Sequence, residues 1–321
     1  MPLPQVLVTA PVPEEGLAVF DGKVNWRVGP AGGPADNEEY LRLLGEAQGC
    51  LVATSALPGE VIRRAPKLKV ISRFGIGYDG VDLRAATECG VIVCNAPTSP
   101  AEATADLAFT LLLGTARQLP RAHDFTKSGE WSRTGKGLPL AIEVHGRTLG
   151  IIGFGRIGRA VARRAAGFSM RVLYYDVLAA PTNIAAERVE LATLLQEADF
   201  VSLHVPLSEA TTGLIGAREL AQMKRSAVLI NASRGPVVDE QALCEALCGG
   251  QIAGAGLDVY SQEPPVVDCP LFELENVVLT PHIGSATYHT RVAMAKEAAE
   301  NILAVLIDGQ PRNVVNPEVL R

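Results

Sequence analysis

The sequence predicts an α/β protein of two doubly wound parallel-sheet domains, with one domain inserted into the other. Short β-rich runs alternate with helical stretches from end to end, which is the pattern of βαβ units. A glycine-rich strand-turn-helix, the unit expected to open such a domain, begins at Leu149 in the middle of the chain. We therefore expect one domain at residues 1–99 and 285–321 and an inserted domain at residues 100–284. The chain then crosses between them twice, so the cleft between domains can hinge.

Composition favours a globular protein that acts on a small dissolved molecule. A chain of 321 residues that is 48% hydrophobic and 20% charged can bury the cores of two domains. Its 35 acidic residues outnumber its 29 basic ones, so no basic field is expected to hold nucleic acid or anionic lipid.

The cysteines and the apolar segments predict a cytoplasmic location. The six cysteines form no CxxC pair and are expected to be reduced thiols: Cys50, Cys89, Cys94, Cys244, Cys248 and Cys269. The amino terminus lacks the cationic start of a signal peptide. No segment approaches the ~20 apolar residues that span a bilayer, so we expect a soluble protein without a membrane partner.

Seven strands are predicted most clearly, each a short run of apolar and β-branched residues. They lie at residues 6–9, 70–72, 149–153, 172–175, 200–205, 227–231 and 277–280. Between the last two lies a predicted helix at residues 239–248, in which Leu243 and Leu247 are one turn apart on the same face. No internal repeat or low-complexity tract is visible.

The central strand runs directly into a GxGxxG sequence that opens a helix. Gly153 would make the tight turn, Gly155 would let a pyrophosphate approach the backbone, and Gly158 would let helix and strand pack closely. Free amides at the helix start would face the phosphates, with Arg156 and Ile157 beside them. An exposed helix arginine is the alternative interpretation of Arg156.

An acidic residue follows the next strand. Asp176 lies 18 residues after Gly158 (176 − 158), where a carboxylate accepts the ribose hydroxyls and repels a 2′-phosphate. Both domains are thus predicted to be Rossmann-like or flavodoxin-like, and the inserted domain is predicted to prefer NAD over NADP.

Three further strand ends are predicted to reach the same site, because ligands of open α/β sheets gather at the carboxyl ends of strands. These ends are His204-Val205-Pro206, Asn231-Ala232-Ser233-Arg234-Gly235 and Gly256-Leu257-Asp258-Val259. Each alone is equally well explained as an ordinary turn.

Hydride transfer to a 2-keto acid needs a cation for the carboxylate, a proton donor for the carbonyl oxygen and a group that controls the charge of the donor. Arg234 offers a planar fork suited to a carboxylate. His282, at the end of the last strand, is the candidate acid and base, and Glu263, in a loop with two prolines, could favour its protonated form. A surface arginine, a structural histidine and a solvent-facing glutamate are the alternatives. His204 is better placed to line a cofactor than to transfer protons, and no histidine-carboxylate cluster has metal spacing.

The order of motifs resembles the D-isomer-specific 2-hydroxyacid dehydrogenase family, most closely its glyoxylate/hydroxypyruvate/2-ketogluconate reductase branch. The motifs are GFGRIG, YYD, NASRGPVVDE, AGLDVYSQEPP and TPHIGSAT, and the likeness extends from about Lys67 onward. It implies NAD-dependent reduction of a small 2-keto acid to the D-2-hydroxy acid, and the reverse oxidation, with Arg234, Glu263 and His282 as the catalytic set.

The resemblance also implies further site residues. The first domain would bind the substrate carboxylate through backbone amides of Phe74, Gly75, Ile76 and Gly77. Contacts with the cofactor are implied for Thr104, Pro206, Thr211, Ala232, Asp258 and Gly284.

Departures from the family pattern and rival functions limit these expectations. Relatives commonly carry a glutamate after TPHIGSAT, where this chain has Tyr288 and His289. Formate dehydrogenases of similar architecture carry glutamine at the position of Glu263, which argues against formate chemistry. The alternatives are a 3-phosphoglycerate dehydrogenase, in which Arg73 would meet a phosphate, and a non-enzymatic NAD-sensing interaction protein of the same fold.

A homodimer is expected through about residues 101–145. Residues 101–131 are predicted to be helical and contain the leucines Leu107, Leu111, Leu112, Leu113 and Leu119, more apolar surface than one domain needs. In the family that it resembles, this region builds a two-fold dimer, and Trp131 would reach toward the partner.

Overall fold

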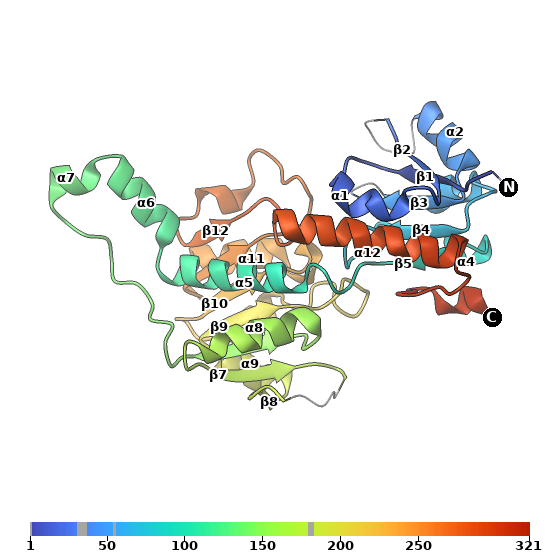
Figure 1. Ribbon diagram of the computed structural model, residues 1–321. Helices are drawn as coiled ribbons and strands as arrows, with labels where there is room; N and C mark the ends of the chain where they lie inside the picture. Colours follow the sequence, from blue (N-terminus) through green and yellow to red (C-terminus); the bar gives the residue numbers. More distant parts are fainter. Residues whose placement is uncertain (1, 31–36, 54–55, 179–182) are drawn as a thin grey trace. The chain divides into compact units, whose positions relative to one another are not determined.

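The computed structural model describes residues 2–30, 37–53, 56–178 and 183–321, and the chain divides into two compact units (Figure 1). Unit 1 comprises Met1–Pro100 and Ser285–Arg321, and unit 2 comprises Ala101–Gly284. Each unit contains one parallel sheet with helices on both faces, so the predicted fold class is confirmed.

Unit 1 has a five-stranded sheet with the order β2-β1-β3-β4-β5. Every neighbouring pair is parallel, and this order is the flavodoxin-like one. The strands are β1 (Gln5–Val8), β2 (Asn25–Val28), β3 (Gly49–Val52), β4 (Val70–Arg73) and β5 (Ile92–Cys94).

Two helical layers cover the sheet of unit 1. One face packs against α2 (Glu38–Glu46), α3 (Gly59–Arg63) and α4 (Leu83–Glu88) around Tyr40, Leu44 and Ile62. The other packs against α1 (Glu14–Leu17), the 3₁₀ turn Ala18–Phe20 and α12 (Tyr288–Leu306), which the chain contributes after it returns from unit 2. Small residues of α12, such as Ala298 and Ala299, are completely buried and allow a close approach to the strands.

Unit 2 has a seven-stranded sheet with the order β12-β11-β10-β9-β6-β7-β8, again parallel throughout. The strands are β6 (Thr148–Ile152), β7 (Arg171–Tyr175), β8 (Glu187–Arg188), β9 (Phe200–Leu203), β10 (Val228–Asn231), β11 (Gly254–Leu257) and β12 (Val277–Leu279). The strand order reverses between β6 and β9, and the crevice outside such a switch point is where a doubly wound sheet binds its ligand.

Helices cover both faces of this sheet as well. On one side lie α5 (Ala101–Ala116) and α8 (Arg156–Ala166), and on the other α9 (Leu191–Glu197), α10 (Ala217–Leu220) and α11 (Glu240–Cys248). The central strands β9, β10 and β11 are buried along their whole length, which explains their continuous apolar sequences.

The stretch at residues 101–131 is helical but is not one long helix. It breaks at Gln118, whose φ of 52° is left-handed, and continues as α6 (Leu119–Lys127) and α7 (Glu130–Thr134). Pro120 in the first turn of α6 explains why a new helix begins there. Leu111 and Leu112 of α5 are buried inside unit 2 itself, so these two leucines offer no surplus apolar surface for a dimer.

Candidate active site

The ends of five strands in unit 2 lie level with one another. Ile152, Leu203, Asn231, Leu257 and Leu279 pair in register across β6, β9, β10, β11 and β12. The residues that follow them therefore leave the sheet along a single edge: Gly153, His204, Ala232, Asp258 and Thr280. The positions of the strand ends in the sequence were enough to predict that these residues lie along one edge of the sheet.

The glycine turn after β6 leaves open space in front of helix α8. Gly153 has a φ of +91°, and a Cβ there would come within 2.6 Å of the His204 carbonyl oxygen. A Cβ on Gly158 would overlap the Gly153 carbonyl oxygen, which is why helix and strand can pack so closely. A Cβ on Gly155 would meet no atom within 4 Å. The turn thus offers room for a phosphate-sized group before the helix amides.

Asp176 follows β7 and its carboxylate rests against the glycine turn. Oδ2 accepts a hydrogen bond from the Phe154 amide at 2.7 Å, and Oδ1 accepts one from the Leu178 amide at 2.8 Å. Arg188 of β8 donates to the Asp176 carbonyl oxygen at 2.8 Å. A cation therefore lies next to the acidic residue, which the sequence did not reveal because β8 is only two residues long.

The ring of His204 is neutral and lies in the wall of the site. Its Nε2 is 2.9 Å from the Ser202 hydroxyl, and burial lowers the pKa of His204 to about 3. Among the described residues Nδ1 has no hydrogen-bond partner. The Thr211 hydroxyl, seven residues along the chain, donates to the Pro206 carbonyl oxygen at 2.6 Å and so closes the turn after β9.

The turn after β10 is held by the side chain of Asn231. Asn231 Oδ1 accepts from the amide and the hydroxyl of Ser233, at 3.0 and 2.8 Å, and Nδ2 donates to the Arg234 carbonyl oxygen at 2.9 Å. A Cβ on Gly235 would overlap the carbonyl oxygen of Tyr260. This glycine lets the Arg234 turn pack directly on the backbone of the loop that carries Glu263.

Asp258, after β11, organises the loop that carries His282. Its carboxylate accepts from the Thr280 hydroxyl at 2.6 Å and from the amides of Ile283 and Gly284, both at 2.8 Å. The side chain is buried, and burial raises the pKa of Asp258 although these hydrogen bonds oppose the rise. Sequence reasoning identified the residue but not this role, because its three partners lie more than 20 residues away along the chain.

Thr104, from the first turns of α5, lies beside the same loop. Its side-chain atoms would be 3.4 Å from a Cβ placed on Gly284. Thr104 is buried, so its position is fixed by packing. The helix thereby contributes to the site from outside the strand ends.

Glu263 and His282 form a hydrogen-bonded pair. Glu263 Oε2 is 2.6 Å from His282 Nδ1, and Oε1 accepts from the Tyr260 amide at 3.2 Å. Burial alone would raise the pKa of Glu263, but the hydrogen bond and charge of His282, the Tyr260 amide and the charge of Arg234 together lower it below its ordinary value. His282 adopts a left-handed φ of 51°, and its backbone amide donates to the Asp258 carbonyl oxygen at 2.9 Å. Arg234, Glu263 and His282 therefore interact as one group.

In unit 1, the loop Phe74–Gly77 follows β4 and presents three free amides. The fourth, that of Phe74, donates to the Val52 carbonyl oxygen at 2.8 Å, so the expectation that it binds the substrate carboxylate is not met. The carbonyl oxygens of Gly75, Ile76 and Gly77 accept hydrogen bonds from the Ala96 amide (2.8 Å), Asn95 Nδ2 (2.7 Å) and Arg73 Nε (3.1 Å). In the described part of the chain no group accepts a hydrogen bond from the amides of Gly75, Ile76 or Gly77. A loop whose carbonyl oxygens already accept hydrogen bonds and whose amides do not donate any is suited to binding an anion.

Comparison with known proteins identifies the family. The family model for the D-isomer specific 2-hydroxyacid dehydrogenase, NAD binding domain, matches residues 109–284. A glyoxylate reductase of Korarchaeum cryptofilum is 44% identical over 99% of this chain and 97% of its own length. The chain belongs to the D-isomer-specific 2-hydroxyacid dehydrogenase family.

Two further relatives of this dehydrogenase bear on its reaction. A glyoxylate/hydroxypyruvate reductase B of Yersinia enterocolitica is 44% identical over 89% of this chain and 90% of its own length. The crystal structure of an NADPH-dependent glyoxylate/hydroxypyruvate reductase from Sinorhizobium meliloti, in complex with NADP and malonate, has a TM-score of 0.88 and 33% identity, covering 98% of this chain and 97% of that one. The dehydrogenase is therefore an oxidoreductase that acts on CH–OH groups with a nicotinamide cofactor, and the resemblance found in the sequence is confirmed.

The residues of unit 2 fit such a cofactor. The open space at Gly155, the amide-rich start of α8 and the carboxylate of Asp176 lie around the switch point of the sheet. The chemistry of this donor set matches a pyrophosphate followed by a ribose.

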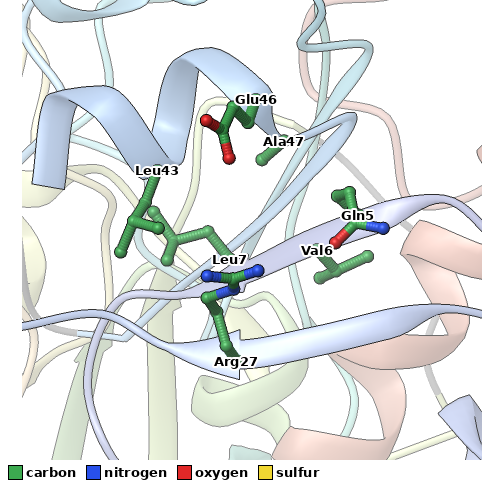
Figure 2. Close-up of a pocket in the computed structure, with 7 residues that line it drawn as sticks. All are labelled: Gln5, Val6, Leu7, Arg27, Leu43, Glu46 and Ala47. Atoms are coloured by element: carbon green, nitrogen blue, oxygen red, sulfur yellow. The ribbon is translucent and has the colours of Figure 1, made fainter. Parts of the chain in front are cut away.

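One cavity in unit 1 is too small to compete with this site. Figure 2 shows this cavity, which is lined by Gln5, Leu7, Arg27, Leu43 and Glu46 among others; its volume of about 10 Å³ holds at most a single water molecule. Within the described residues, no three His, Cys, Asp or Glu side chains are grouped to hold a metal ion. No helix there is both long and apolar enough to cross a bilayer.

Proposed function

We propose that this dehydrogenase reduces small 2-keto acids of the glyoxylate and hydroxypyruvate type, with 2-ketogluconate as a further candidate, to D-2-hydroxy acids and uses NADH as its preferred electron donor. The observation that carries the proposal is the 2.6 Å pair between Glu263 and His282 beside Arg234, at the strand ends next to the glycine turn. The names of the glyoxylate and glyoxylate/hydroxypyruvate reductases at 44% identity support the substrate class.

The proposed reaction adds a hydride to C2 and a proton to the carbonyl oxygen of the keto acid. The bound nicotinamide supplies the hydride. Because Nδ1 of His282 is engaged by Glu263, Nε2 is the atom left to give the proton as the alkoxide develops. Arg234 holds the carboxylate, and its charge also favours the transition state, in which negative charge grows on the oxygen.

The amides of Gly75, Ile76 and Gly77 are proposed as a second partner for the substrate carboxylate, without the Phe74 amide, which donates to Val52. These three amides have no acceptor among the described residues. The residues proposed to line the cofactor all belong to unit 2: Thr104, Gly153, Gly155, Arg156, Ile157, Gly158, Asp176, His204, Val205, Pro206, Thr211, Ala232, Ser233, Arg234, Asp258, His282 and Gly284.

A substrate screen tests the proposed reaction. Glyoxylate, hydroxypyruvate, 2-ketogluconate and 3-phosphohydroxypyruvate are each supplied with NADH, and kcat/KM is measured for the unmodified protein and for His282→Ala. Turnover of glyoxylate or hydroxypyruvate is expected, with kcat roughly 100- to 10,000-fold lower in His282→Ala and NADH affinity by fluorescence little changed. Near-normal turnover in His282→Ala would contradict the proposed acid.

The same screen separates the rival functions. A preference for 3-phosphohydroxypyruvate would favour a phosphoglycerate dehydrogenase, but Arg73, the residue that suggested it, donates its Nε to the Gly77 carbonyl oxygen at 3.1 Å and so braces the loop. Absence of turnover with every keto acid, together with tight NADH binding, would favour an NAD-sensing interaction protein.

The preference for NAD over NADP is proposed from Asp176. Its carboxylate beside the glycine turn would repel a 2′-phosphate, so NADH should exceed NADPH at least tenfold in kcat/KM, or roughly 1.4 kcal/mol. Asp176→Ser should narrow the gap because Arg188 is bonded to the carbonyl of the same residue and would remain as a cation. Measured kcat/KM for NADH and for NADPH checks this prediction, and equal values in the unmodified protein would overturn the assignment.

A cytoplasmic location is proposed as well. All six cysteines are free thiols, and three of them, Cys50, Cys94 and Cys269, are buried. Burial raises the pKa of Cys50 and of Cys94 to about 12, so these two are unreactive structural residues. Unpaired thiols suit a reducing compartment.

A further inference from the structure

Within unit 2, both backbone groups of Phe154, the residue between the first two glycines of the turn, are hydrogen-bonded to side chains. Asp176 Oδ2 accepts from the Phe154 amide at 2.7 Å. Arg159 Nε donates to the Phe154 carbonyl oxygen at 3.0 Å. The glycine turn is therefore held at two successive peptide bonds, by a carboxylate at the first and by a guanidinium at the second.

The side chain of Phe154 is held as well. Its ring is buried and stacks on the ring of Tyr174 in β7, with centroids 4.0 Å apart and planes inclined by 17°. The Arg159 guanidinium carbon lies 5.8 Å from the centre of the Phe154 ring. Since Arg159 belongs to α8, Phe154 is anchored to the helix and to the strand on either side of the turn.

The bond from Arg159 also sets the direction of the next amide. A trans peptide is planar, so its carbonyl and its N–H point in opposite directions. The Phe154 carbonyl and the Gly155 amide share one peptide, so the Gly155 amide points away from Arg159. In the described part of the chain no group accepts a hydrogen bond from this amide, and a Cβ on Gly155 would meet no atom within 4 Å. The amide is held in one direction and left free for a ligand.

We propose that Arg159 is a positioning residue for the cofactor: by holding the Phe154 carbonyl oxygen, it keeps the Gly155 amide directed at the pyrophosphate. This inference rests on the proposed function, in which the glycine turn receives the cofactor. Glycine accepts φ of either sign, so the backbone at Gly155 does little to oppose rotation of this peptide. A rotated peptide would present its carbonyl oxygen to the phosphates and repel them. Arg159 prevents this rotation through the backbone, without touching the cofactor.

Three variants separate the hydrogen bond of Arg159 from its charge. Arg159→Met removes both. Arg159→Gln keeps a donor, because its amide nitrogen is the same number of bonds from the backbone as Arg Nε, but removes the charge. The control Arg163→Met removes an exposed cation of the same helix, which pairs with Glu102. For each we would measure the dissociation constant of NADH by fluorescence, and the inhibition constants of ADP and of adenosine in competition with NADH.

The expected effect is confined to ligands that carry a pyrophosphate. Arg159→Met should raise the NADH dissociation constant and the ADP inhibition constant about tenfold, the loss of one hydrogen bond to a charged group. Adenosine, which has no phosphate, should bind Arg159→Met as well as it binds the unmodified protein. Arg159→Gln should keep all three constants within about threefold, and Arg163→Met should leave them unchanged.

The outcomes separate this inference from the proposed function. If the unmodified protein binds neither NADH nor NADPH, the proposed function fails. If it binds NADH and Arg159→Met leaves the ADP constant unchanged, or weakens adenosine as much as ADP, the positioning role is wrong. Equal weakening in Arg159→Gln and Arg159→Met would show that the charge attracts the phosphates, which also contradicts the inference. Thermal unfolding identifies a misfolded variant, and Arg159→Leu, which likewise cannot donate, then replaces Arg159→Met.

Discussion

The charge on Glu263 is expected to set the pH range of the reaction. Its carboxylate favours the protonated imidazole of His282, which is the form that gives a proton to the keto acid. Glu263→Gln keeps an acceptor for Nδ1 but removes the charge. The limb on which kcat/KM for reduction falls as pH rises should therefore move to lower pH.

The measurement is a pH profile of kcat/KM for the unmodified protein and Glu263→Gln, with Glu245→Gln on the exposed surface of α11 as control. An unmoved profile in Glu263→Gln would show that the pair does not control the proton donor.

The same pair also has a defined effect on stability. Because the pKa of Glu263 is lowered from 4.5, its contribution to folding is present above that value and is lost as pH falls through the lowered pKa.

Single residues differ in how far the sequence could predict their roles. Arg234 and His282 follow predicted strand ends, so their shared location follows from sheet topology. The position of Glu263, the partner of His282, does not follow from sheet topology, because a glutamate in a loop near two prolines is usually solvated. Only the folded loop, closed by the bond from the Tyr260 amide, directs the Glu263 carboxylate at Nδ1.

At the scale of elements, strands were easier to predict than the helical stretch after residue 100. Apolar runs such as residues 149–153 and 227–231 appear as β6 and β10 with ends shifted by a single residue. The run at residues 200–205 ends two residues early, at Leu203, because the chain turns toward the site at His204. The strands β2, β3, β5 and β8 were not among the seven predicted most clearly. β8 consists of two exposed residues, which carry no hydrophobic pattern.

The helical stretch after residue 100 shows why periodicity is a poor guide to helix ends. Leucines continue across residues 107–119, but left-handed backbone at Gln118 and Gly129 divides the stretch into α5, α6 and α7. The leucines of this stretch differ in how far they are buried. Leu111 and Leu112 are fully buried in unit 2, whereas Leu119 is 61% exposed. Composition alone could not distinguish core leucines from surface ones.

At the scale of the whole molecule, α6 and α7 are the helices of unit 2 that pack least against the rest of that unit. Neither helix has a buried residue, and in Figure 1 they extend beyond the sheet of unit 2. Pro139 and Leu140 of the following segment line a cavity of about 450 Å³ together with the first residues of β10 and β12. Apolar side chains lie exposed along this stretch, with Leu119 at 61%, Trp131 at 57% and Leu140 at 99%.

We infer that a second copy of the chain covers this surface and that the dehydrogenase is a homodimer through about residues 101–145. Helices without buried residues are marginal by themselves, because most helical stability in proteins comes from tertiary packing. An exposed apolar surface rimmed by polar residues marks a protein interface, and a two-fold contact would pair α6 and α7 with the same region of the partner. The surface argument rests on Leu119, Trp131 and Leu140, since the leucines of α5 serve the core of unit 2.

Light scattering at micromolar concentration should give twice the chain mass of 33.9 kDa. Leu119→Glu and Trp131→Glu should each shift the mass toward that of one chain, because a charge would be buried at the contact. Leu320→Glu, which alters a residue of unit 1 that is 53% exposed, should leave the dimer intact. A monomer mass for the unmodified protein would contradict the proposed dimer. A dimer that survives both Leu119→Glu and Trp131→Glu would place the interface on another surface.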